Sequence, residues 1–206
     1  MSDSTGRLIT DVSVDEYFSR AVHAAVQNRD TPISGETSVY LGHLLTRFLN
    51  TEHLYDATPD GMAIRPLAML YGDAMQAPSL EARISGLRRL GDVALFIAGL
   101  FSHSLGRSLV DVDYYIAMGG NAYGCIADNG HRHRHARRLR EVFLELAGRF
   151  TECMDVLADV GESSGLHNDT DVLRLYEIWL GSGSTRAAQK LRALGIEPVS
   201  LQRRQH

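Results

Sequence analysis

Apolar residues recur every three or four positions along most of the chain, which is the spacing of one face of an α-helix. Ser13 and Glu16 form a capping-box pattern before the first such stretch. Two stretches, 80–105 and 139–160, alternate steps of four and three as a coiled-coil seam does. No stretch sustains the strict alternation of a half-buried strand, so the pattern predicts helices and no sheet.

Caps, glycines and prolines divide this pattern into eight helical segments. We predict helices over residues 13–27, 36–50, 63–76, 79–105, 108–128, 135–160, 169–181 and 184–195, with a turn-rich loop at 56–61. Helices joined by short links pack antiparallel to their neighbours. The fold class is therefore all-α, a single-domain bundle of about seven or eight helices over residues 12–198, with tails at 1–11 and 199–206.

Composition narrows the class of protein without identifying a function. The chain has 206 residues, of which 44% are hydrophobic and 22% are charged, as in ordinary globular domains. Its net charge of −4 argues against a general nucleic-acid binder. The longest apolar run, Val93–Phe101, is far shorter than the roughly 20 residues of a membrane span. Residues 1–11 are polar and lack the apolar core of a signal peptide, so we expect a cytoplasmic protein without a membrane segment.

A cluster of basic side chains is the first candidate site. Residues 131–206 carry 12 basic and 10 acidic side chains, whereas residues 1–130 carry 9 and 15. The candidate residues for binding a partner or an anion are His131, Arg132, His133, Arg134, His135, Arg137 and Arg138. Cations at the start of a helix interact unfavourably with the positive end of its dipole, and an acidic partner would neutralise their charge. The alternative is a basic turn whose charges face water.

The same histidines do not define a metal site. His131 and His135 are four residues apart, but third and fourth ligands are not visible and the nearby arginines repel a cation. We therefore predict no metal and no cofactor.

The glycine-rich segment of the predicted helix 108–128 is the second candidate. Three glycines lower the stability of this helix, so we expect another interaction to compensate for the loss. They are Gly119, Gly120 and Gly124. Small residues let another backbone approach closely, and tight packing against Val93–Phe101 is one explanation. The other is a slot for a flat ligand, to which Tyr115 could offer a hydroxyl group.

In these positions the chain resembles the haem oxygenases, which are all-α proteins of similar length. That family has a ligating histidine in its first helix and a glycine-rich kinked helix over the haem. Here His23 lies in the first predicted helix and Gly119, Gly120 and Gly124 in a later one. The resemblance covers these positions only, and it implies a pocket for a haem-type ligand lined by His23.

The C-terminal pair of predicted helices is the third candidate. Residues 171–195 place a short glycine-containing turn before a helix with Arg186, Gln189 and Arg192, as in a helix-turn-helix. Any helical hairpin can show this pattern, and the negative net charge disfavours binding to nucleic acid.

The sequence contains no P-loop, no His-Glu-x-x-His pattern and no nucleophile elbow, so no catalytic residue is predicted. The leading hypothesis is a non-catalytic cytoplasmic adaptor or regulator that binds a protein partner, with a homodimer as one form of that interaction, through the basic His/Arg cluster. The alternatives are a small-ligand or haem-type binding protein or enzyme, with its pocket at the glycine-rich helix 112–127, and DNA binding through the helical hairpin 171–195.

Overall fold

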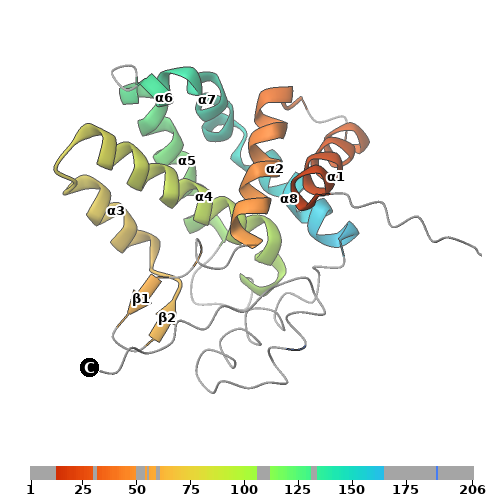
Figure 1. The fold of residues 1–206 in the computed structure, drawn as a ribbon, viewed down its shortest axis with the longest axis horizontal. Helices are drawn as coiled ribbons and strands as arrows, with labels where there is room; N and C mark the ends of the chain where they lie inside the picture. Colours follow the sequence, from red (N-terminus) through yellow and green to blue (C-terminus); the bar gives the residue numbers. More distant parts are fainter. Residues whose placement is uncertain are drawn as a thin grey trace, which may run out of the picture.

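The computed structural model describes residues 13–29, 32–49, 54, 56–58, 61–105, 112–130, 134–164 and 189. These residues form an all-α bundle, which confirms the predicted fold class (Figure 1). The helices are α1 (Val14–Asn28), α2 (Gly35–Leu49), α3 (Leu67–Met75), α4 (Leu80–Leu105), α5 (Val112–Asn129), α6 (Arg134–Arg138), α7 (Arg140–Gly148) and α8 (Phe150–Ser163). The helices predicted at 169–195 and the tails at 1–11 and 199–206 lie outside the described residues.

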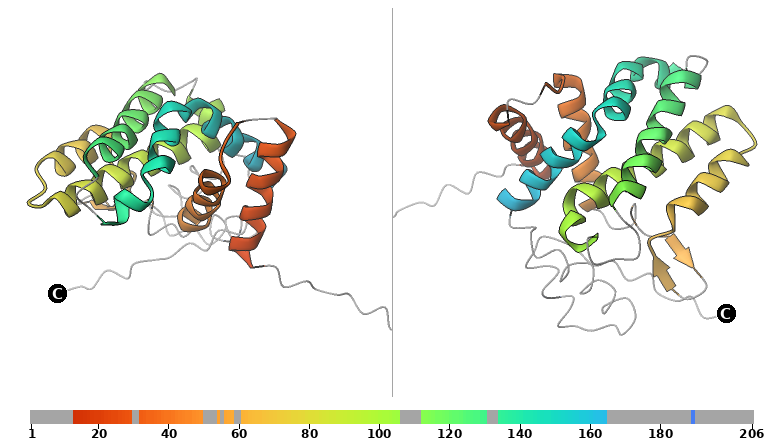
Figure 2. Two further views of the ribbon diagram at one scale, coloured as in Figure 1. Left: turned by 90° about the horizontal axis from the view of Figure 1, so that it is seen from above. Right: turned by 180° about the vertical axis from the view of Figure 1, so that it is seen from behind.

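Helix α4 is the centre of the bundle. Every residue from Leu90 to Leu100 is buried, as its nearly continuous apolar sequence predicts. Helix α5 runs beside α4, and α3 and α8 also pack on it, so α4 is covered from several sides (Figure 2). Helices α1 and α2 pack on each other. Helix α1 also contacts α8, and α2 also contacts α7. None of the described helices combines the length and apolarity needed to cross a bilayer.

A small hairpin replaces part of the predicted loop at 56–61. Strands β1 (Asp56–Thr58) and β2 (Gly61–Ala63) pair antiparallel, with Asp56 opposite Ala63 and Thr58 opposite Gly61. The prediction of no sheet was therefore wrong at this point. Strands of three residues are too short to show an alternating pattern in the sequence, which is why the hairpin was missed.

The long helix predicted over 135–160 is divided into α6, α7 and α8. The backbone departs from helical geometry at Leu139 and at Arg149, where φ is −127° and ψ is 37°. Gly148, a weak helix former, precedes the second break. The apolar seam nevertheless stays on the inner side, since Phe143, Phe150 and Leu157 are all buried. The spacing of apolar residues indicates which face of a helix is buried, and the same face stays buried where the chain bends.

Candidate functional site

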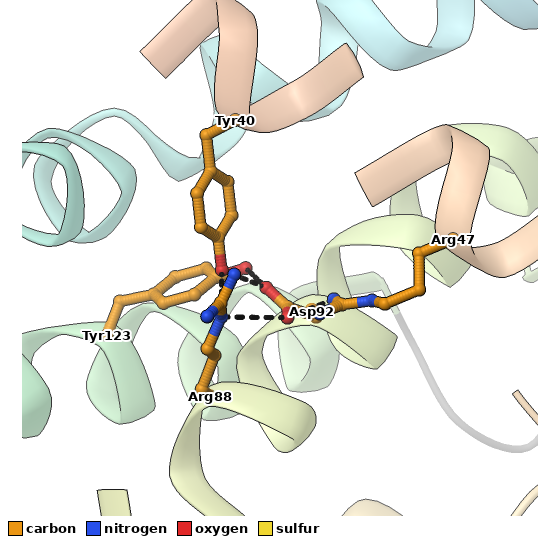
Figure 3. Close-up of polar contacts among 5 residues, drawn as sticks. All are labelled: Tyr40, Arg47, Arg88, Asp92 and Tyr123. Atoms are coloured by element: carbon orange, nitrogen blue, oxygen red, sulfur yellow. Dashed lines mark hydrogen bonds and ion pairs between the residues drawn. The ribbon is translucent and has the colours of Figure 1, made fainter. Parts of the chain in front are cut away.

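A buried carboxylate organises the most polar part of the core. Asp92 lies in the buried stretch of α4 and is itself 0% exposed. The hydroxyl groups of Tyr40 on α2 and Tyr123 on α5 both donate to Asp92 Oδ1, at 2.6 and 2.7 Å (Figure 3). A buried charge is tolerated only when it is well hydrogen-bonded or paired. The three residues therefore tie α2, α4 and α5 together at one point.

Two arginines complete this network from the solvent side. Arg47 of α2 forms an ion pair with Asp92 Oδ2. The Arg88 Nε atom lies 3.7 Å from the same oxygen and donates to the Tyr40 hydroxyl at 3.1 Å. The side chains of Arg47 and Arg88 are 34% and 30% exposed, against 0% for that of Asp92. One buried carboxylate thus holds two guanidinium groups that still reach solvent.

Helical spacing places these side chains together. Arg88 and Asp92 are four residues apart on α4, and Tyr40 and Arg47 are seven apart on α2, so each pair shares a helix face. Each guanidinium group also lies on an aromatic ring, with the Arg88 Cζ 5.1 Å from the Tyr40 ring centroid and the Arg47 Cζ 5.0 Å from that of Phe48. Such cation–π contacts further restrict the side chains.

The network forms one wall of a pocket of about 260 Å³ between α2 and α4. The pocket is lined by Arg47, Phe48, Ser85, Arg88, Arg89 and Asp92. Its charged side chains are three arginines and one aspartate, so positive charge is in excess. Guanidinium groups recognise carboxylates and phosphates through paired N–H donors. The arrangement is chemically suited to binding an oxyanion.

The protonation states of the tyrosines and of Arg88 are consistent with an oxyanion site. Burial and the negative charge of Asp92 raise the pKa of Tyr40 and of Tyr123 well above the ordinary value, so both remain hydrogen-bond donors. Burial alone would lower the pKa of Arg88, but its interactions with Tyr40 and Asp92 raise the pKa above its usual value. Both tyrosines are therefore neutral at physiological pH, and Arg88 is charged.

The structure places only part of the predicted basic cluster. Arg134 and His135 lie in α6, and Arg137 and Arg138 are exposed on the same short helix. His131, Arg132 and His133 lie outside the described residues, as does the predicted DNA-binding hairpin at 171–195. Over the described ranges, no group of three or more His, Cys, Asp or Glu side chains is arranged to hold a metal ion.

The proposed haem-type pocket residues lie in different surroundings. His23 is exposed on α1 and lines an open groove of about 490 Å³ between α1 and α2, with Gly35 and Val39 among its neighbours. Gly119, on α5, is buried instead, and a Cβ atom built there would lie 2.5 Å from the Phe150 ring and 2.9 Å from Ala94. Close packing thus accounts for the small residue at position 119.

The other members of that proposed pocket lie on the same helix. Gly120 and Gly124 face α7, and Cβ atoms built at these two positions would lie 3.6 and 3.9 Å from atoms of Ala147. Tyr115 is half-buried with its ring edge-on to Tyr114, and burial raises the pKa of Tyr115. A Cβ at position 120 or 124 would therefore make only ordinary van der Waals contacts.

The residues of the pocket and of the buried network behind it were not predicted from the sequence, because they are spread from Tyr40 to Tyr123. One signal was present. Asp92 is the single charged residue in the apolar stretch from Leu90 to Leu100, and Arg88 precedes it by one helical turn. A carboxylate inside a stretch that must be buried requires partners.

The fold and the pocket together define an all-α protein with an arginine-lined cavity beside a buried aspartate. Comparisons with protein families, with curated proteins and with solved structures found no match.

Proposed function

We propose that this protein binds a small ligand through an oxyanion group in the pocket between α2 and α4. The proposal rests on one observation, the pair of guanidinium groups from two helices that a single buried carboxylate holds at the pocket wall. Asp92 also lines the pocket, but it is fully buried and its oxygens accept hydrogen bonds from its partners, so the arginines are the groups more exposed to a ligand.

Preorganisation favours this use of the arginines. A free arginine side chain loses considerable rotamer entropy when it binds a ligand. Arg88 is already held by its Nε contacts, and among the described residues its two terminal nitrogens, with four N–H donors, have no hydrogen-bond partner. Ser85, one turn before Arg89 on α4, adds a hydroxyl group to the same pocket. A ligand rich in acceptor atoms matches this set of donors.

The test introduces a negative charge into the pocket without changing the buried network. Ser85 is exposed on α4, so Ser85→Glu should leave the fold intact while placing a carboxylate beside the arginines. Ala82→Glu is the matched control, because Ala82 is exposed on the same helix and does not line the pocket. Affinities for sulfate and inorganic phosphate are measured by NMR titration at pH 7.5 for the wild-type protein and both variants.

We expect Ser85→Glu to weaken anion binding by about tenfold or more, because like charges about 4 Å apart near a protein surface repel by about 4 kcal/mol, more than the roughly 1.4 kcal/mol of a tenfold change. Ala82→Glu should bind as the wild-type protein does. Equal affinities in all three proteins, or no measurable affinity in any of them, would overturn the proposal.

A second proposal concerns the basic segment at 131–138, as a surface for an acidic protein partner. The exposure of Arg137 and Arg138 on α6 supports it, since both guanidinium groups are accessible to a partner. In this role the protein is a cytoplasmic adaptor or regulator, and its partner is a different protein or a second copy of the chain.

Affinity purification with wild-type protein and with the triple variant Arg134→Ala, Arg137→Ala and Arg138→Ala tests this second role. Partner recovery should fall in the variant and also in the wild-type protein at high salt, because salt screens exposed charges. Arg20→Ala is the control, since the Arg20 side chain is 69% exposed on α1 and is not part of the basic segment. Undiminished recovery with the triple variant would exclude this surface.

A further inference from the structure

We infer that the oxyanion held in this pocket is a dianionic phosphate group, either free phosphate or the head of a small phosphate monoester. This inference rests on the proposed function and adds the chemical class of the ligand. Three features of the pocket carry it, namely its charge, the directions of its donors and its size.

The charge of the lining favours a dianion over a monoanion. Arg47, Arg88 and Arg89 contribute guanidinium groups, and Asp92 contributes the only carboxylate among the residues that line the pocket. Tyr40 and Tyr123, which lie behind Asp92, are neutral. Attraction to a positively charged wall grows with ligand charge, and it is stronger in a partly enclosed site than in bulk water.

The donors converge from two helices rather than from one plane. Arg47 lies on α2, whereas Ser85 and Arg88 lie on one face of α4, on the other side of the pocket. A planar carboxylate presents two oxygens to a single fork, whereas a phosphate presents three acceptor oxygens in different directions. A tetrahedral group therefore satisfies donors from both walls at once.

The size and lining of the pocket limit the rest of the ligand. Pockets for drug-sized molecules have volumes of about 300–1,000 Å³. This pocket, at about 260 Å³, is smaller, and its one aromatic side chain, Phe48, is only 3% exposed beneath Arg47. Little apolar surface is offered, so the phosphate itself provides most of the recognition.

The experiment separates charge from shape with matched probes. Affinities for methyl phosphate, dimethyl phosphate, sulfate, acetate and inorganic phosphate are measured by NMR titration of the full chain at pH 7.5, and those for methyl phosphate and sulfate again at pH 5.0. Dimethyl phosphate is tetrahedral but carries one charge, and acetate is a planar monoanion. Phosphate monoesters have a second pKa of about 6, so methyl phosphate is mostly a monoanion at pH 5.0.

We expect methyl phosphate to bind at pH 7.5 at least about tenfold more tightly than dimethyl phosphate or acetate, and to weaken by about tenfold at pH 5.0, which is the loss of its dianion. Sulfate is a dianion at both pH values, so its unchanged affinity would show that the protein itself does not cause the difference. Tighter binding of inorganic phosphate or of methyl phosphate then identifies free phosphate or a monoester as the source.

The inference is overturned if dimethyl phosphate or acetate binds as tightly as methyl phosphate, or if sulfate binds more than tenfold more tightly. In those outcomes the Ser85→Glu variant still loses affinity, and the proposed oxyanion site stands with another ligand class. If Ser85→Glu does not change the affinity for these anions, the proposed location of the site is wrong.

Discussion

The ring of Tyr123 lies directly against the backbone of Gly91, one residue before the buried Asp92. A Cβ atom at position 91 would lie 2.7 Å from Tyr123 Cε1 and 2.8 Å from Cζ. Tyr123 is fully buried and its hydroxyl is held by Asp92, so the ring has no room to move away. The absence of a side chain at Gly91 is therefore what lets α5 deliver a hydrogen bond to α4.

Replacement of Gly91 by alanine should consequently destabilise the protein. We expect a loss of about 1–3 kcal/mol in the free energy of unfolding, as in other overpacked cores, measured by urea denaturation. Gly72→Ala is the control, because nothing lies within 4 Å of a Cβ built there and α3 should gain about 1 kcal/mol from the better helix former. Similar effects of the two substitutions would contradict this account of Gly91.

The glycines of α5 also differ in how closely neighbouring atoms would approach an added Cβ. A Cβ at Gly119 would overlap the Phe150 ring at 2.5 Å, whereas at Gly120 and Gly124 the nearest atoms lie at 3.6 and 3.9 Å. We expect Gly119→Ala to destabilise by about 1–3 kcal/mol and the other two substitutions to stabilise by about 0.5–1 kcal/mol. Thermal or urea unfolding of the three variants gives the comparison. Destabilisation by all three would mean that α5 has closer neighbours than these contacts indicate.

The sequence predicted the fold class well because burial leaves a periodic signal. The predicted helix over 79–105 matches α4, since a stretch such as Leu90–Leu100 must be covered on all sides. The break at Arg149 left no signal, because Phe143, Phe150 and Leu157 keep their spacing across it. Phe150, the first residue after this bend, packs against Gly119 of another helix, a contact that the local sequence does not indicate.

The candidate site was not predicted, because its members come from three helices. Asp92 alone marks a buried charge, but nothing in the local pattern shows that Tyr40 and Tyr123 reach it. The sequence of the glycine-rich segment allowed either close packing or a ligand slot, and Gly119, like Gly91, makes room for an aromatic ring. Periodicity identifies buried faces, and the partners across a helix interface require the tertiary structure.

The buried tyrosines predict a loss of stability at alkaline pH. Burial and Asp92 raise the pKa of Tyr40 and Tyr123 in the folded protein well above 10, the value expected when the chain is unfolded. The unfolded state therefore releases these protons first, so the stabilisation is complete below pH 10 and is lost as the pH rises above it. Each tyrosine contributes a slope of up to about 1.4 kcal/mol per pH unit.

Urea midpoints between pH 8 and pH 11 measure this slope. Tyr123→Phe should lower stability by about 1.5–3 kcal/mol at pH 8, since it removes a hydrogen bond to a charged group, and should reduce the alkaline slope. Tyr71→Phe, at an exposed position on α3, should keep the wild-type profile. Burial also raises the pKa of Cys153 to about 12 from 9.0, so a separate loss of stability that begins near pH 9 should persist in both variants. An unchanged slope in Tyr123→Phe would contradict the assignment.

Glu145 of α7 caps a helix to which it does not belong. Its Oε1 accepts from the Ser34 backbone N–H at 3.0 Å, and its Oε2 accepts from the hydroxyl groups of Ser34 and Thr37 at 2.6 and 2.5 Å. These groups lie at the start of α2, where backbone N–H groups lack partners within the helix and a negative charge is favourable. One carboxylate thereby fixes the start of α2 against α7.

Acid should therefore weaken the protein through this residue. Partial burial alone would raise the pKa of Glu145, but the hydrogen bonds from Ser34 and Thr37 outweigh it and hold the pKa below the usual 4.5. The carboxylate thus contributes stability that is complete above about pH 4.5 and is lost as the pH falls through its lower folded value. Glu145→Gln should cost about 1 kcal/mol at pH 7, and this difference from the wild-type protein should shrink at pH 3.5. Glu141→Gln on the same helix is the control, because its side chain is 78% exposed. A deficit for Glu145→Gln that stays constant from pH 7 to pH 3.5 would show that the charge of Glu145 does not stabilise the start of α2.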